Sequence, residues 1–148
     1  FKGIDRRFSI RLTAPKVVID DYAHHPTEIN AVADALEAFY PNQIKLGVFQ
    51  PHLFSRTRDF LTGFKQALAR FDEVLLLDIY PARELPMEGI TSALLVNESH
   101  TATQLIDKHM LSEMIAKSTA TVVAIMGAGD IAFEVPAVIQ TLKNQQYA

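Results

Sequence analysis

The 148-residue sequence contains no cysteine. This absence excludes disulfide bonds, thiolate catalysis and thiolate metal sites, and it fits a reducing compartment such as the cytoplasm. No stretch approaches the roughly 20 consecutive apolar residues of a membrane-spanning helix. The first residues lack the pattern of a secretory signal peptide, and residue 1 is Phe rather than Met. We therefore expect a fragment of a cytoplasmic protein that has no membrane partner.

The sequence also lacks an excess of positive charge, since its formal net charge is −3. Nucleic acids and acidic membrane surfaces are bound by basic faces, so neither is expected as a partner. A small anionic substrate stays compatible, because a few arginines can hold it. The sequence has no G-x-x-x-x-G-K-[ST] phosphate loop and no G-x-S-x-G hydrolase motif. By itself, the chain shows no means of holding the phosphates of ATP.

Strands and amphipathic helices alternate along the chain, and 49% hydrophobic residues suffice for one core. Apolar residues at three- and four-residue steps predict a helix from Pro26 to before Pro41 and a second one between Pro51 and Phe71. Other patterns predict strands over 8–12, 17–20, 44–49, 73–78, 103–106 and 121–126, and helices over 91–97, over 110–116 and after Asp130. This order predicts a Rossmann-like, mainly parallel sheet flanked by helices on both faces, in a single α/β domain over residues 1–148.

Ligands of such sheets bind beyond the carboxyl ends of the strands, and residues 20–28 follow one of these ends. The segment holds two carboxylates, a phenol and two imidazoles: Asp20, Asp21, Tyr22, His24 and His25. Imidazoles can bind an anion or accept a proton near neutral pH, and an aspartate can hold a ribose hydroxyl or a metal ion. Taken alone, each residue has a structural alternative, such as capping of the helix by His25 or Thr27. Their density favours a binding site.

A second polar segment, residues 50–59, leads from a predicted strand into a helix. Arg56 and Arg58 lie near the expected helix start, where the helix macrodipole disfavours cations unless an anion is bound. Backbone N–H groups and a bidentate guanidinium together suit a carboxylate or a phosphate. The alternative is that Arg58 only pairs with Asp59 on a solvated face. Arg56 is the stronger candidate, because His52 is expected to face the same crevice.

Two further segments are less specific. Residues 127–132 (GAGDIA) match the loose dinucleotide fingerprint G-x-G-x-x-A, but no strand with a ribose-binding acid follows them. A tight turn is the favoured interpretation, with a loop that faces a substrate as the alternative. Residues 79–89 contain two prolines and a final glycine, which predicts an ordered surface loop. No histidine pair with metal-ligand spacing occurs outside residues 20–28, so no metal site is expected.

Several motifs resemble those of the C-terminal domain of Mur ligases. Residues 21–26 (DYAHHP) resemble the family's D-Y-A-H-x-P signature, and residues 49–59 (FQPHLFSRTRD) resemble a segment of the member that adds L-alanine. Further agreement comes from residues 6–8 (RRF), 78–84 (DIYPARE), 89–92 (GITS) and 127–131 (GAGDI). These segments follow the family order across nearly the whole chain.

The resemblance implies a three-domain enzyme of peptidoglycan synthesis. In the family, the N-terminal domain binds the UDP-sugar, the central domain carries the ATP phosphate loop, and the C-terminal domain delivers the amino acid. ATP phosphorylates the lactyl carboxylate of UDP-N-acetylmuramate, and the amine of L-alanine then attacks the acyl phosphate. ATP and Mg²⁺ would be held mainly by the central domain, so the C-terminal domain alone is expected to be inactive.

By the same resemblance, Tyr22, His24, His52 and Arg56 surround L-alanine. Arg56 is expected to bind the carboxylate of L-alanine. His24 and His52 are the candidates for catalysis, and spacing alone does not say which of them handles a proton.

The resemblance also assigns residues to ATP. Arg7 and Asp21 match positions that reach ATP in the family, Asp21 through the ribose hydroxyls. Leu53 departs from the family pattern, which often has an arginine there. Arg56 is therefore expected to hold the carboxylate with less help, or to share it with Arg58.

Two other functions stay open at this stage. A ligase that attaches a recycled tripeptide to the same UDP-sugar shares the D-[YF]-A-H-H-P element, but it is not expected to carry the P-H-x-x-S-R-T-R-D segment. A non-catalytic module that binds a small molecule is the second alternative. It would apply if no phosphate-loop domain preceded this chain.

Overall fold

The computed structural model describes residues 6–96 and 102–146. They form a six-stranded sheet in the order β1-β2-β6-β3-β4-β5, in which β1 is antiparallel to β2 and the other neighbours are parallel. The strands are β1 (Ser9–Leu12), β2 (Val17–Asp21), β3 (Lys45–Phe49), β4 (Glu73–Leu76), β5 (Thr103–Leu105) and β6 (Val122–Met126). The predicted α/β sheet is confirmed, and no strand end differs from its prediction by more than two residues.

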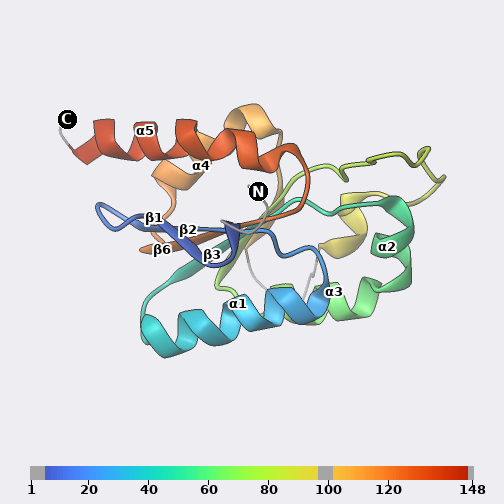
Figure 1. The fold of residues 1–148 in the computed structure, drawn as a ribbon, viewed down its shortest axis with the longest axis horizontal. Coiled ribbons are helices and arrows are strands. Elements are labelled where there is room, and N and C mark those ends of the chain that lie inside the picture. Colours follow the sequence, from blue (N-terminus) through green and yellow to red (C-terminus); the bar gives the residue numbers. More distant parts are fainter. Residues whose placement is uncertain (1–5, 97–101, 147–148) are drawn as a thin grey trace.

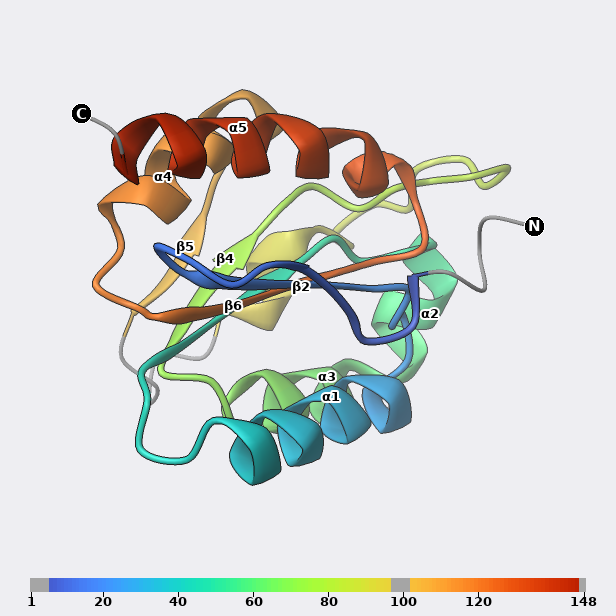
Figure 2. The same cartoon turned by 60° about the vertical axis from the view of Figure 1, so that its left-hand side comes forward.

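Helices cover both faces of the sheet (Figures 1 and 2). On one face lie α1 (Pro26–Phe39) and α3 (Leu61–Leu68), and on the other lie α4 (Leu111–Lys117) and α5 (Val135–Gln146). Strand β6 shows why both faces need cover, because alternate side chains of a strand point to opposite faces. Val122, Ala124 and Met126 belong to the core beneath α1 and α3, and Val123 and Ile125 to the core beneath α4 and α5.

The remaining helical segments are short: α2 (Phe54–Asp59) and the 3-10 helices η2 (Ser92–Leu95), η3 (Lys108–Met110) and η4 (Asp130–Glu134). The helix predicted over 91–97 is thus a 3-10 turn, and residue 97 lies outside the described residues. The last helix opens with a 3-10 turn, η4, before α5. Among the described residues, every helix is too short or too polar to cross a membrane.

The prediction of one helix between Pro51 and Phe71 is wrong, because the segment forms two helices, α2 and α3. They meet at Phe60, whose backbone angles of φ −117° and ψ 26° leave the helical region. The Phe60 N–H still donates to the Arg56 carbonyl oxygen (3.0 Å), and its own carbonyl oxygen accepts from Phe64 (2.9 Å). Apolar side chains therefore keep a helical spacing across a break in the backbone.

Strand β6 lies between β2 and β3, so the loops that follow these three strands share one edge of the sheet. The loop after β6 begins at Gly127, where φ is 154°. A Cβ atom at this position would lie 2.9 Å from Ile131 and 3.2 Å from the Gln50 carbonyl oxygen. Glycine thus lets β6 end close against the chain that leaves β3. As a result, the segments after β2 and β3 can meet across β6.

Candidate functional site

The segment after β2 divides into structural and exposed side chains. His25 caps α1, because its Nδ1 accepts a hydrogen bond from the Thr27 N–H (3.3 Å). The structural alternative thus holds for His25, whose ring also packs edge-on against Phe60. Asp20 is 1% exposed and forms ion pairs with Arg6 (3.0 Å) and Arg11 (3.3 Å). These two residues stabilise the start of the domain and leave Asp21, Tyr22 and His24 for binding.

Asp21 is buried and anchors two backbone segments. Its Oδ2 accepts from the Phe8 N–H (2.7 Å), and its Oδ1 accepts from the Ala23 N–H (2.8 Å). Burial raises the pKa of Asp21, and these two N–H groups oppose the increase. Each carboxylate oxygen keeps a second lone pair with which it can accept a hydroxyl.

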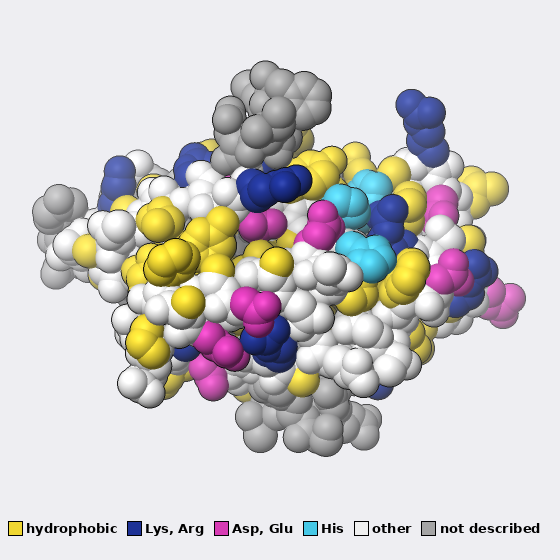
Figure 3. Space-filling view, turned by 60° about the horizontal axis from the view of Figure 1, so that its bottom comes forward, with side chains coloured by type: hydrophobic (Ala, Val, Ile, Leu, Met, Phe, Trp, Pro, Cys, Tyr) yellow, Lys and Arg dark blue, Asp and Glu magenta, His cyan; other side chains and the backbone are white. Residues whose placement is uncertain are grey.

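Four side chains predicted to surround the amino acid lie next to one another. The rings of Tyr22 and His24 meet edge to face, with centroids 5.2 Å apart, and the His24 and His52 centroids are 5.8 Å apart. Arg56 completes the row, since its Nη1 lies 3.1 Å from Nδ1 of His52. Figure 3 shows histidine and basic side chains gathered on one open face of the domain. We call these four residues the imidazole–guanidinium cluster.

His24 is oriented by its neighbours in the chain. Its Nδ1 lies 3.0 Å from the Tyr22 carbonyl oxygen and 3.4 Å from the Glu28 carboxylate. Glu28 also accepts from the His24 backbone N–H (3.1 Å). When Nδ1 carries the proton and donates to these oxygens, Nε2 of a neutral ring has a free lone pair. His24 can therefore accept a proton through Nε2.

His52 and Arg56 form a hydrogen-bonded pair. Arg56 Nη1 donates to Nδ1 of His52 and to the His52 carbonyl oxygen (3.4 Å). Burial lowers the pKa of His52, the charges of Arg56 and His24 lower it further, and Glu84 opposes them. A neutral His52 accepts the Arg56 hydrogen bond, whereas the protonated ring would repel the guanidinium. The pair thus leaves Arg56 with further N–H donors for an anion.

The sequence argument for Arg56 and Arg58 needs correction. Helix α2 has only six residues, and both arginines lie in its last turn, so the helix macrodipole does not disfavour them. Arg58 is half exposed and pairs with Asp59 (2.8 Å), as the structural alternative predicted. The case for an anion site therefore rests on Arg56 and on its contact with His52.

Two residues of the loop 79–89 contact the cluster or the helix that carries it, and neither was predicted as a site residue. The Tyr80 ring stacks on His52, with centroids 5.7 Å apart and an interplanar angle of 22°. Glu84 binds Ser55, which lies between His52 and Arg56. The loop was expected to be ordered, and an ordered loop beside strand ends is a common place for site residues. That signal could have identified Tyr80 and Glu84.

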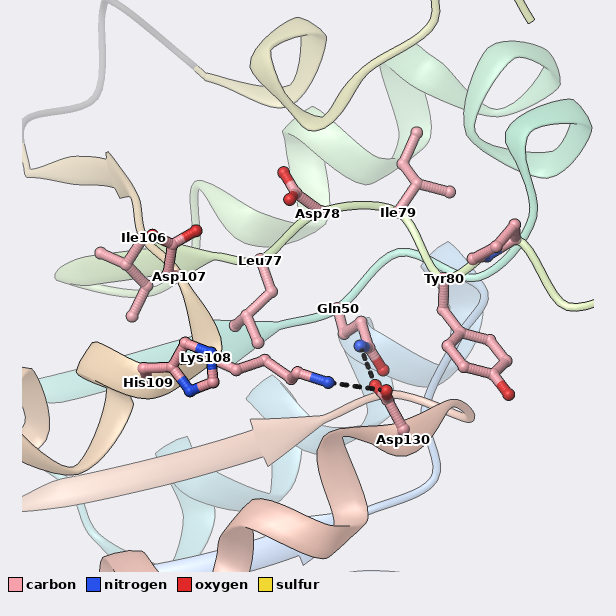
Figure 4. Close-up of a pocket in the computed structure, with 11 residues that line it drawn as sticks. Gln50, Leu77, Asp78, Ile79, Tyr80, Ile106, Asp107, Lys108, His109 and Asp130 are labelled. Carbon is pink, nitrogen blue, oxygen red and sulfur yellow. Dashed lines mark hydrogen bonds and ion pairs between the residues drawn. The ribbon is translucent and has the colours of Figure 1, made fainter. Parts of the chain in front are cut away.

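The loop after β6 is held in place by Gln50, in agreement with the tight-turn interpretation. Gln50 Nε2 donates to Asp130 Oδ1 (2.6 Å), and its Oε1 accepts from the Ile131 N–H (3.1 Å). Lys108 donates to the other Asp130 oxygen (2.8 Å), as Figure 4 shows. Gln50, Lys108 and Asp130 line a pocket of about 260 Å³. Tyr80 also lines this pocket while it stacks on His52, so its ring lies between the pocket and the cluster.

A larger groove lies beside β2 and α1. Its volume is about 420 Å³, and both residues expected to reach ATP, Arg7 and Asp21, line it. Apolar side chains such as Phe8, Val32 and Phe39 form much of its surface. The groove therefore combines one exposed cation, the buried carboxylate of Asp21, the partly buried Glu28 and an apolar surface. Among residues 6–96 and 102–146, no group of three or more His, Asp or Glu side chains could hold a metal ion.

The fold and the cluster define a class of domain: an α/β domain that presents imidazoles and a guanidinium at the carboxyl edge of its sheet. Residues 6–129 match the family model described as Mur ligase, glutamate ligase domain. The chain therefore belongs to the Mur ligase family.

Curated relatives agree with this assignment. A UDP-N-acetylmuramate–L-alanine ligase from Christiangramia forsetii is 57% identical over 147 residues, which are 98% of this chain and 32% of the relative. The enzyme of the same name from Porphyromonas gingivalis is 46% identical over 134 residues, covering 88% of this chain and 29% of the relative. The chain thus spans about a third of the length of the curated relatives it matches.

Solved structures match the fold. A UDP-N-acetylmuramate-alanine ligase from Thermotoga maritima has a TM-score of 0.74 and 26% identity, covering 97% of this chain and 30% of that one. A domain from a putative UDP-N-acetylmuramate:L-alanyl-γ-D-glutamyl-diaminopimelate ligase of Haemophilus ducreyi has a TM-score of 0.67 and 24% identity. The match covers 92% of this chain and 99% of that one, so the related structure has nearly the same extent.

Proposed function

We propose that the chain is the C-terminal domain of an ATP-dependent, three-domain cytoplasmic ligase that joins L-alanine to UDP-N-acetylmuramate. The observation that carries the proposal is the imidazole–guanidinium cluster, in which two segments far apart in the sequence bring Tyr22, His24, His52 and Arg56 together. Relatives at 57% identity that bear this activity in their names support it. The remaining two thirds of those relatives would supply the UDP-sugar site and the phosphate loop.

The cluster suits a zwitterionic amino acid. Arg56 binds the carboxylate, because a guanidinium presents paired N–H donors that match two carboxylate oxygens. Tyr22, His24 and His52 surround the amine and methyl group. An amine must lose a proton before it can attack, and His24 can accept that proton through Nε2. The lone pair of the neutral His52 ring already accepts from Arg56, so His52 can take the proton only when that hydrogen bond is broken.

The reaction needs an activated acid, which this chain does not supply. When bound, ATP supplies the phosphoryl group that activates the lactyl carboxylate, and Mg²⁺ accompanies it in the central domain. The alanine nitrogen then forms a bond to the carbonyl carbon, and phosphate leaves with the electron pair of the broken C–O bond. The domain contributes by holding the amine close to that carbon, which can account for a large part of the rate.

Arg7 and Asp21 are proposed to contact ATP. Both line the 420 Å³ groove, where Arg7 is exposed and Asp21 keeps one free lone pair on each oxygen. A ribose hydroxyl can donate to Asp21, and Arg7 can pair with a phosphate. The apolar surface of the groove leaves room for a flat base.

The tripeptide-adding alternative has weaker support. A murein peptide ligase from Psychrobacter arcticus shares the fold at a TM-score of 0.70 with 16% identity, and the Haemophilus ducreyi ligase domain shares it at a TM-score of 0.67 with 24% identity. The alanine-adding relatives match at 40% to 57% identity. A non-catalytic module remains the alternative from another class, and it would require a parent protein without a phosphate-loop domain.

The proposal is tested by the kinetics of Arg56→Ala in the complete ligase. Losing a hydrogen-bonded charge should raise the KM for L-alanine by about 10- to 100-fold and leave the KM for UDP-N-acetylmuramate within about twofold. Arg58→Ala is the matched control, because Arg58 pairs with Asp59. Equal effects on both substrates, or turnover with tripeptide but not with L-alanine, would contradict the proposal.

A further inference from the structure

The loop 79–89 runs alongside the segment that carries His52 and Arg56. The Tyr80 N–H donates to the Pro51 carbonyl oxygen (2.8 Å), and the Leu53 N–H donates to the Tyr80 carbonyl oxygen (2.9 Å). Two residues further on, the Ser55 N–H donates to Glu84 Oε1 (3.1 Å). Every second residue from Pro51 to Ser55 is therefore bound to the loop.

Helix α2 cannot cap its own N-terminus. The residue at the N-cap position is Leu53, which has no side-chain acceptor, and its φ of 73° lies in the left-handed region. Glu84 takes over the capping bond from outside the helix, since it accepts from the backbone N–H of Ser55 and from its hydroxyl. A leucine with positive φ is costly, so contacts from elsewhere must hold the backbone in this conformation.

Glu84 itself is fixed by a tight turn. Its N–H donates to the Pro81 carbonyl oxygen (2.9 Å), and Ala82 inside the turn has a φ of 54°. The hydrogen bonds from Ser55 lower the pKa of Glu84, so the carboxylate is charged at neutral pH. The turn therefore holds the charged Glu84 carboxylate in place as a hydrogen-bond acceptor for α2.

We propose that Glu84 is the positioning residue of the amino-acid site: by clamping Ser55, it fixes His52 and Arg56, which stand three and one residues away, in the geometry that binds the substrate. This role rests on the function proposed above. Glu84 touches neither the substrate nor the reacting atoms, and it acts through α2.

Glu84 also contributes to the field at His52. The charged or titratable groups that face His52 are Arg56, His24, Glu84 and the stacked Tyr80. Of the charges that shift the pKa of His52, Glu84 alone favours the protonated form. Removing the Glu84 charge should therefore lower the pKa of His52. The decrease of kcat/KM at acidic pH, which occurs where the neutral His52 ring becomes protonated, should then move to lower pH.

The test compares Glu84→Ala and Glu84→Gln in the complete ligase. Glu84→Ala loses both bonds to Ser55, so the KM for L-alanine should rise about tenfold or more, while the KM values for ATP and UDP-N-acetylmuramate stay within about twofold. Glutamine can accept from the Ser55 N–H and donate to its hydroxyl. Glu84→Gln should therefore bring the KM for L-alanine back to within about threefold of wild type and shift the acidic decrease of kcat/KM to lower pH.

Two controls make the result decisive. Glu88→Ala changes an exposed carboxylate of the same loop and should leave all three KM values unchanged. Ser55→Ala removes only the hydroxyl contact and should raise the KM for L-alanine about threefold, which gives a readout if Glu84→Ala does not fold. Three results would overturn the role of Glu84. The KM for L-alanine could stay unchanged in Glu84→Ala and Ser55→Ala, the KM values for all three substrates could rise equally, or glutamine could fail to rescue the KM. If Arg56→Ala also leaves that KM unchanged, the proposed function itself fails.

Discussion

His52 is the residue whose protonation the structure constrains most clearly. It is partly buried, lies beside the Arg56 guanidinium, and accepts a hydrogen bond on Nδ1. All three favour the neutral ring. A neutral imidazole leaves the guanidinium free to attract a carboxylate, so the protonation state of His52 and the affinity of Arg56 for an anion are coupled.

This coupling predicts the direction in which the pKa of His52 is shifted and how that pKa responds to the loss of Arg56. In the domain, its pKa should lie below the ordinary value of 6.5, and Arg56→Met should raise it part of the way back, because burial, the largest cause, remains. At a pH between the pKa of His52 in the folded domain and 6.5, His52 binds more protons in the unfolded chain than in the folded one. The contribution of His52 to the free energy of unfolding should therefore fall as the pH falls through this window. NMR titration of the His52 ring protons measures the pKa. A value at or above 6.5, or one that Arg56→Met does not move, would contradict the coupling.

The residues of the cluster could be predicted because they follow β2 and β3, two strands whose carboxyl ends share one edge of the sheet. The ordered loop 79–89 indicated where further site residues could lie, but the contacts of Tyr80 with His52 and of Glu84 with Ser55 could not be predicted. Leu53 and Ala82 beside these contacts adopt positive φ, and no pattern around a leucine or an alanine indicates that conformation. Likewise, His25 and His24 are adjacent in sequence, and only the backbone at the start of α1 makes one a cap and the other a ligand candidate.

Among the elements, strands were easier to predict than helix breaks. β-branched and other apolar residues in short runs mark β2, β3 and β6, which are buried on both faces. The apolar spacing across Phe60 is continuous, so the break between α2 and α3 leaves no trace in the hydrophobic pattern. The break ends α2 after six residues, and at the other end of this short helix, where Leu53 provides no side-chain cap, Glu84 accepts from the Ser55 N–H.

Strand β3 gives a prediction about packing. Gly47 faces the buried ring of Phe71, and an added Cβ would lie 2.9 to 3.1 Å from three of its ring atoms. Gly47→Ala should therefore lower the free energy of unfolding by about 1–3 kcal/mol. Urea unfolding of the domain measures this loss. The double variant Gly47→Ala/Phe71→Leu should show positive coupling, because the smaller side chain relieves the clash; strictly additive effects would count against this contact.

On the scale of the whole molecule, the chain corresponds to one part of the longer curated relatives. The cluster and the groove with Arg7 and Asp21 both open on the surface, and the curated relatives are about three times as long as the chain, which makes up 32% of their length. The proposed sites for an amino acid and for ATP on one domain need a third reactant, the activated acid, to be brought against them. Closure of the other domains is the expected means.

The domain alone should therefore fold without catalysis. A related domain of nearly the same extent forms the same fold in a solved structure, so residues 1–148 should show a cooperative unfolding transition. They should release no phosphate from ATP in the presence of L-alanine and UDP-N-acetylmuramate, whereas the complete ligase should. A colorimetric phosphate assay on both proteins checks this. Turnover by the isolated domain would mean that the phosphate-binding machinery lies within it.

The central claim is that Arg56 and the imidazoles beside it bind the amino acid. It is tested most directly by a crystal structure of the complete ligase with L-alanine and a non-hydrolysable ATP analogue. We predict the alanine carboxylate at about 3 Å from the Arg56 guanidinium, with its nitrogen facing His24 and His52. A carboxylate bound by other residues, with Arg56 turned away from it, would contradict the account.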